Sequence, residues 1–119
     1  LAASSTDDKA IMYQAPYYTQ PEVGQIPEWV NEFNLASWEP WLTYDAVSLS
    51  ANLSEVPVSI VHSETAAVPD GAHRFFEGLQ GPKKELWLEG VTQFGFYHED
   101  EPVRRAADRV SAHFDETLR

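Results

Sequence analysis

Two short stretches of this chain carry the side chains best suited to acid–base chemistry. The first is "HSET", residues 62–65, in which the carboxylate of Glu64 could orient a partner or receive a proton. The second is "TQFGFYHED", residues 92–100, which holds the amide Gln93 and, five residues later, His98. Histidine titrates near neutral pH, whereas a carboxamide only donates and accepts hydrogen bonds. The pattern predicts a candidate site made from Glu64, Gln93 and His98.

Each of these residues also has a structural interpretation. Glu64 could be an acid just before the helix that begins at Pro69, and His98 could be a solvated residue before the last helix. His62 and Glu64, with His98 a loop away, could hold zinc only with a third ligand from elsewhere, so no metal site and no cofactor are predicted. The remaining histidines are predicted to pack at a strand end or to lie on helix surfaces: His62, His73 and His113.

The elements that must position these stretches follow from the hydrophobic pattern. The run "VPVSIV", residues 56–61, is apolar and β-branched at nearly every position, which predicts a strand buried on both faces. A helix is predicted from Pro69 to Gly81, a second strand over 84–90, and a last helix from Asp100. This alternation predicts an α/β fold with two parallel strands and a right-handed crossover.

Parallel strands end at the same edge of a sheet, so the loops after the two predicted strands should meet there. Ligands gather at this edge in open α/β sheets. A parallel sheet of only two strands is too small to be covered on both faces. The chain is therefore expected to lie against further strands, supplied by another segment or by self-association.

The N-terminal part differs in composition. Residues 1–9 are small and polar and are predicted to be disordered, and residues 10–52 are predicted to form a helical, cap-like segment with a short helix or turn near its start. Further helices are expected over about 27–36 and about 39–44. Closely spaced aromatic residues usually form packing surfaces, but here they are also candidate walls of a substrate site: Trp29, Phe33, Trp38 and Trp41, with Tyr97 from the later loop.

Four stretches together resemble the C-terminal half of α/β hydrolases of the dienelactone-hydrolase-like group. They are "IPEWVNEFNLASWEPWLTYDA", "VPVSIVHSETAAVPDGA", "GPKKELWLEG" and "FGFYHEDEPV". The resemblance implies that residues 53–119 form the C-terminal subdomain of that fold, after the cap-like segment. It also implies an ester or acyl hydrolase whose triad acid lies at Glu64, or at Thr65 in a more orthodox alignment, and whose triad histidine falls on Gln93.

The sequence departs from this family at two positions that catalysis needs. It contains no Gly-x-Ser-x-Gly elbow, so the nucleophilic serine would come from a complementary N-terminal hydrolase segment. Gln93 is far too weak a base to replace a histidine, whose loss from a working triad costs about a million-fold in turnover. The alternative is a non-catalytic ligand-binding or interaction module that dimerises to complete its sheet, and a small acyl or ester compound is the ligand that the resemblance implies.

Composition excludes several other classes of function. With 19 acidic and 8 basic residues the formal charge is -11, which repels nucleic acid and anionic membranes. The chain has no cysteine, so disulfides and a thiol nucleophile are excluded. No apolar run approaches the roughly 20 residues that span a bilayer, and a soluble, cytoplasmic protein is expected.

Overall fold

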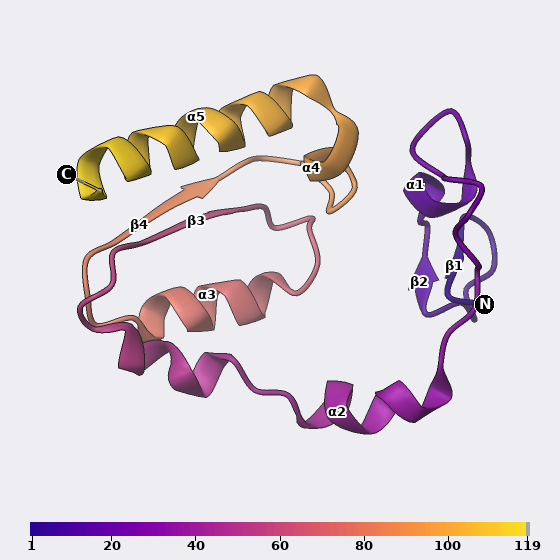
Figure 1. Ribbon diagram of the computed structural model, residues 1–119, viewed down its shortest axis with the longest axis horizontal. Coiled ribbons are helices and arrows are strands. Elements are labelled where there is room, and N and C mark those ends of the chain that lie inside the picture. The colour runs from indigo at the N-terminus through magenta and orange to yellow at the C-terminus, as the bar shows by residue number, and fades with distance from the viewer. Residues whose placement is uncertain (119) are drawn as a thin grey trace. The chain divides into compact units, whose positions relative to one another are not determined.

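A computed structural model describes residues 1–118 as a mixed α/β protein with two small parallel two-stranded sheets and several helices (Figure 1). The chain divides into two compact units, Leu1–Tyr44 and a second one that begins at Asp45. The sequence predicts a division after residue 52. The residues before that point join the second unit, because the 3-10 helix η2 (Val47–Leu53) packs against α3 (Pro69–Gly78).

The first unit contains a minimal parallel pair, β1 (Ala3–Ser4) and β2 (Met12–Tyr13). Strand β1 lies within residues 1–9, whose composition predicts disorder. Its small side chains allow close packing, and Ala3 is fully buried. The side-chain amide of Asn31 donates to the carbonyl oxygen of Ala3 and accepts from its N–H, each at 2.8 Å. A tertiary contact thus supplies the order that local composition does not predict.

The helices of the first unit are short: α1 (Pro16–Thr19), η1 (Leu35–Ser37) and α2 (Trp38–Thr43). The helix predicted over about 39–44 is confirmed by α2. The helix predicted over about 27–36 is wrong, since residues 20–34 form turns and loop and the next helix begins only at Leu35. The N–H of Trp29 closes a turn on the carbonyl oxygen of Ile26 at 3.2 Å, and Asn31 is bound to β1. These contacts override a weak helical propensity.

The second unit contains the parallel pair β3 (Val58–His62) and β4 (Lys83–Trp87). Their register runs from Val58 opposite Lys83 to His62 opposite Trp87. The predicted parallel pairing of these two segments is confirmed. The N–H of Leu88 donates to the carbonyl oxygen of His62 at 2.8 Å, so the strands stay adjacent up to the point where the two loops begin.

Helices α3 and α5 (Asp100–Thr117) lie on opposite sides of this sheet, and the short helix α4 (Gly95–His98) precedes α5 (Figure 1). The predicted helices at Pro69 and Asp100 are confirmed. Helix α3 ends at Gly78, where the ammonium of Lys83 donates to the carbonyl oxygens of Phe76, Glu77 and Leu79 at 2.9, 3.2 and 3.1 Å. A cation at a helix C-terminus satisfies free carbonyls and complements the helix dipole.

Burial in the second unit is shallower than the sequence predicts. Every residue of β3 is half-buried, so the predicted burial on both faces is wrong. In a sheet of only two strands each strand is also an edge strand, so the helices on its two sides do not enclose it completely. On α5, Val103, Val110 and Phe114 are 40%, 41% and 51% exposed. Among the described residues, the buried hydrophobic side chains of this unit are Leu79, Leu88 and Val91.

Candidate functional site

The loops that follow β3 and β4 are tied to each other at the carboxyl edge of the sheet. The hydroxyl of Thr65, in the first loop, donates a hydrogen bond of 2.9 Å to the carbonyl oxygen of Val91, in the second. The N–H of Ala67 donates to Oε1 of Gln93 at 3.3 Å. The predicted meeting of these two loops is therefore confirmed, and it places the acid-bearing segment against the segment that holds Gln93.

The acid-bearing loop is held at both of its ends. Ser63 is fully buried, and its hydroxyl oxygen accepts the N–H of Thr65 at 3.2 Å and lies 3.1 Å from the Thr65 hydroxyl. At the other end Val68 has φ 51° and ψ 52°, a left-handed conformation that strains a β-branched residue. Its carbonyl oxygen accepts the N–H groups of Gly71 and Ala72, so the first turn of α3 holds Val68 in place.

Glu64 forms an acid–histidine pair with a residue of α3. Its Oε1 lies 2.8 Å from Nε2 of His73. The imidazole of His73 stacks on the indole of Trp87, with 3.9 Å between ring centroids and 12° between planes. His62 lies 5.1 Å from the same indole, and the Glu85 carboxylate accepts the indole N–H at 2.8 Å. The result is a carboxylate–imidazole–indole cluster beside the end of the sheet.

This cluster is open to solvent. The side chains of Glu64 and His73 are 68% and 41% exposed, so their pairing contributes about 0–1 kcal/mol to stability. A carboxylate at Nε2 favours the tautomer that is protonated there, which leaves Nδ1 to accept a proton. The sequence predicts His73 only as a helix-surface residue. No local pattern signals the pair, because it depends on how α3 is seated against Trp87.

Gln93 uses both ends of its amide within the loops. Besides the bond from Ala67 to its oxygen, its Nε2 donates to the hydroxyl of Tyr97 at 3.1 Å. The amide thus joins the acid-bearing loop to α4. In this geometry Gln93 is a structural bridge and has no capacity to act as a base.

The other predicted site residues lie as follows. Nδ1 of His98 bonds to the carbonyl oxygen of Phe94 at 2.7 Å, so the imidazole sits at the C-terminal end of α4. Thr65, the alternative position for the triad acid, carries the hydroxyl that ties the two loops together. Tyr97 packs edge-on against Phe94, with 5.9 Å between ring centroids. Three of the predicted catalytic and binding residues of the second unit therefore share the segment 93–98.

The predicted aromatic walls of the first unit fall into two groups. Phe33 lies 5.2 Å from Trp38 and 6.4 Å from Trp41 between ring centroids. Trp29 contacts Tyr18 at 5.5 Å instead. Tyr18, which the sequence does not single out, also packs edge-on against Tyr17 at 5.3 Å. The Trp29 group surrounds a pocket, whereas Trp41 is 67% exposed beside Phe33.

Within residues 1–118, no group of three or more His, Asp or Glu side chains could hold a metal ion. None of the helices described here has the length and apolar character needed to cross a membrane.

Comparison with models of protein families finds no match for the chain, and a search among curated proteins finds no similar sequence. A functional proposal therefore depends on the residues and the geometry of the two loops.

Proposed function

We propose that this chain is the C-terminal segment of an α/β-hydrolase-like protein, completed by a complementary hydrolase segment or by a second copy. The observation that carries the proposal is the tie between the two loops at the carboxyl edge of β3 and β4. In the family that the sequence resembles, these loops bring the triad acid and histidine together. Here the bonds of Thr65 and Gln93 join the corresponding loops.

The incomplete core of the second unit supports the proposal that a partner completes it. Among residues 1–118, each strand of this sheet has one edge without a neighbouring strand. Strand β4 begins with Lys83, Lys84 and Glu85, and such charges protect a solvent-facing edge from pairing. Strand β3 reads "VSIVH", whose apolar β-branched residues are typical of an interior strand. We therefore assign the open edge of β3 as the edge to which further strands add.

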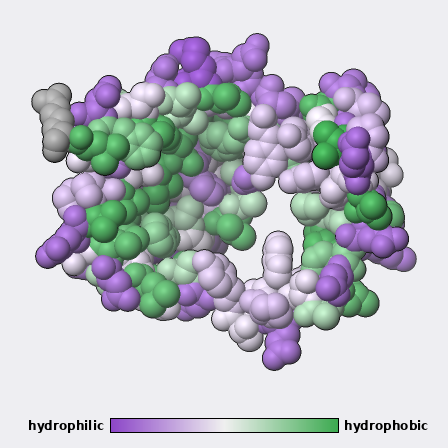
Figure 2. Space-filling model, viewed as in Figure 1, coloured by the Kyte–Doolittle hydropathy of each residue, from purple (hydrophilic) through white to green (hydrophobic). Residues whose placement is uncertain are grey.

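Exposed apolar side chains support the same conclusion. Figure 2 shows hydrophobic residues gathered over much of one face of the second unit. The exposed stripe on α5 lies on that unit and consists of Val103, Val110 and Phe114. An apolar stripe of this kind on a helix is normally buried against a neighbouring element. A partner segment that extends the sheet would also cover helix surface of this character.

The substrate class follows from the resemblance alone, and it is a small acyl or ester compound. The serine nucleophile and its oxyanion hole would belong to the partner segment. The chain contributes the two loops and, in the position of the base, an amide. We infer that turnover through a normal triad is not supported by this chain, because a carboxamide does not accept the serine proton at neutral pH.

A second candidate function is favoured by the hydrogen bonds of Gln93. Both ends of its amide are occupied within the loops, which suits a site that holds a ligand without converting it. This candidate is a non-catalytic ligand-binding module with the same incomplete sheet. The two candidates predict the same partner but different chemistry.

The partner is tested by isolating the chain from its native source and measuring its mass under native and denaturing conditions. We expect the 13.4 kDa chain to travel with a second polypeptide or with another copy of itself. A stable monomer at low micromolar concentration, with a cooperative unfolding transition, would overturn the proposal.

The chemistry is tested on the same native material with a fluorophosphonate probe and a short-chain nitrophenyl ester. Because this chain lacks the base, the hydrolase-like function predicts that the probe labels the partner segment only in the Gln93→His variant. This variant should also raise ester turnover at least a hundredfold, whereas the matched Gln93→Asn variant should do neither. Ligand binding alone predicts no labelling and no gain. Labelling of this chain itself would contradict both, because it carries no serine elbow.

A further inference from the structure

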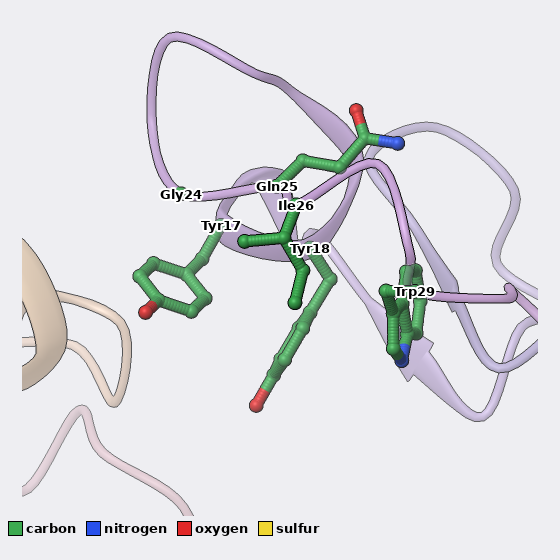
Figure 3. A pocket seen from close by; sticks show the side chains of 6 residues that line it. All are labelled: Tyr17, Tyr18, Gly24, Gln25, Ile26 and Trp29. Carbon is green, nitrogen blue, oxygen red and sulfur yellow. The ribbon is translucent and has the colours of Figure 1, made fainter.

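The first unit contains a small apolar pocket, made by residues other than those of the two loops. It measures about 150 Å³ and is lined by one contiguous part of the chain: Tyr17, Tyr18, Gly24, Gln25, Ile26 and Trp29 (Figure 3). In the figure the side chains of Tyr17, Tyr18, Ile26 and Trp29 extend to the same side of the loop. That of Gln25 extends to the opposite side. The pocket wall is therefore three aromatic rings and one aliphatic side chain.

The walls are held in place by the loop that carries them. The N–H groups of Val23, Gly24 and Gln25 all donate to the carbonyl oxygen of Gln20, at 3.0, 3.2 and 3.2 Å. A β-carbon on Gly24 would stand 2.4 Å from the ring of Tyr17. Only glycine allows this ring and the loop backbone to approach so closely. The Tyr17 ring therefore packs directly against the backbone of the loop at Gly24.

The ring arrangement suits a positively charged group. The planes of Tyr17 and Tyr18 stand at 88° to each other, so they offer two walls at a corner, and the ring of Trp29 follows at 5.5 Å from Tyr18. Aromatic faces attract a cation that lies within about 6 Å of the ring centroid, and such walls recognise quaternary ammonium groups. A pocket of this size is below the roughly 300 Å³ of sites for whole drug-like molecules, so it fits a headgroup.

Charge around the pocket favours the same ligand. Residues 1–44 carry six acidic side chains against one lysine. Two of the acids, Glu22 and Glu28, belong to the pocket loop and are exposed. A surface of one sign attracts ligands of the other and repels those of its own. Anionic ligands are therefore disfavoured here, and a cation gains from both the rings and the surrounding field.

We propose that this pocket binds a quaternary or methylated ammonium headgroup of the choline type. The contact is made by the faces of Tyr17, Tyr18 and Trp29, with Ile26 closing the apolar side. The proposal does not depend on the hydrolase-like function, because it concerns a different set of residues and a binding step alone.

The test compares choline with 3,3-dimethylbutan-1-ol, its uncharged isostere, by tryptophan fluorescence and by proton chemical-shift changes on the full chain. We expect choline to bind at least tenfold more tightly than the isostere. Equal affinity for the two compounds, or no response to choline, to the isostere and to phosphatidylcholine vesicles alike, overturns the proposal. Phosphatidylcholine vesicles form a second arm, and a response to vesicles without one to free choline assigns a lipid as the source of the headgroup.

Two variants locate the site. Trp29→Leu should weaken choline binding about tenfold, and the matched control Trp41→Leu, outside the pocket, should leave it unchanged. Gly24→Ala should also weaken binding, because the new β-carbon displaces the Tyr17 ring, and far-ultraviolet circular dichroism confirms that the variant remains folded. Equal effects of the two tryptophan substitutions would place binding elsewhere and overturn the assignment.

Discussion

The hydroxyl of Thr65 is predicted to be the main tie between the two loops of the candidate site. Thr65→Val keeps the shape of the side chain and removes the donor to the Val91 carbonyl oxygen, 2.9 Å away, and the contact with the Ser63 hydroxyl at 3.1 Å. Val91 is buried whereas Thr65 is exposed, so the bond between them is part-buried. A lost hydrogen bond costs about 0.5–1.5 kcal/mol net, so the loss of both contacts predicts a decrease of about 2 kcal/mol in the free energy of unfolding.

The measurement is urea denaturation of the chain, followed by circular dichroism and tryptophan fluorescence, together with hydrogen exchange of the loop amides. A loss of about 2 kcal/mol corresponds to about a thirtyfold faster exchange for amides that open with the loops. Thr65→Ser is the control, because it retains the hydroxyl and should recover most of the stability. Gln93→Ala removes only exposed bonds and should cost less, about 1 kcal/mol or below.

Two results would refute this reasoning. If Thr65→Ser is as unstable as Thr65→Val, the methyl group and not the hydroxyl stabilises the loops. If Thr65→Val costs less than about 0.5 kcal/mol while loop exchange stays slow, the two loops are held together by contacts other than this bond.

Three further predictions concern the second unit. Lys83→Met should cost about 1–2 kcal/mol in denaturant unfolding, because Lys83 bonds to three carbonyl oxygens at the end of α3 and lies 4.9 Å from the Phe76 ring. Lys84→Met breaks only an exposed ion pair and should cost clearly less. Equal losses would contradict the capping role of Lys83. Gly81→Ala should lower the stability by about 1–3 kcal/mol in a thermal melt, because its β-carbon would stand 2.4 Å from a backbone carbonyl oxygen. Gly71→Ala is the control in α3. Its β-carbon would stand 3.8 Å from the β-carbon of Val68, so this variant should be neutral or stabilising. The hydrogen bond and the charge of Lys84 lower the pKa of Glu116 below 4.5, so this pair stabilises the fold above that pH, and its contribution is lost as the pH falls through the lowered native pKa. In Lys84→Met, the titration midpoint of Glu116, followed by carboxyl chemical shifts, should move back toward 4.5. An unchanged midpoint would exclude the pair as the cause of the lowered pKa.

The elements that the sequence predicts well are those with a strong local pattern. The β-branched run at 56–61 predicts β3, and the apolar period after Pro69 and after Asp100 predicts α3 and α5. Parallel pairing follows from the order of these elements, since a crossover helix joins the strands. The helix predicted over about 27–36 fails because local propensity there is weak and Asn31 is recruited by β1.

The sequence by itself determined that the loops of Glu64 and Gln93 meet, because parallel strands bring their carboxyl ends to one edge. It could not determine the partners of those residues. The tertiary structure decided those partners. It pairs Glu64 with His73, and it places Gln93 as a bridge from Ala67 to Tyr97. It also brings Tyr17 and Tyr18 together with Trp29 around a pocket. The physical reason is that hydrogen bonds and ring contacts act over a few ångströms, and the packing of helices and loops, not spacing along the chain, sets those distances.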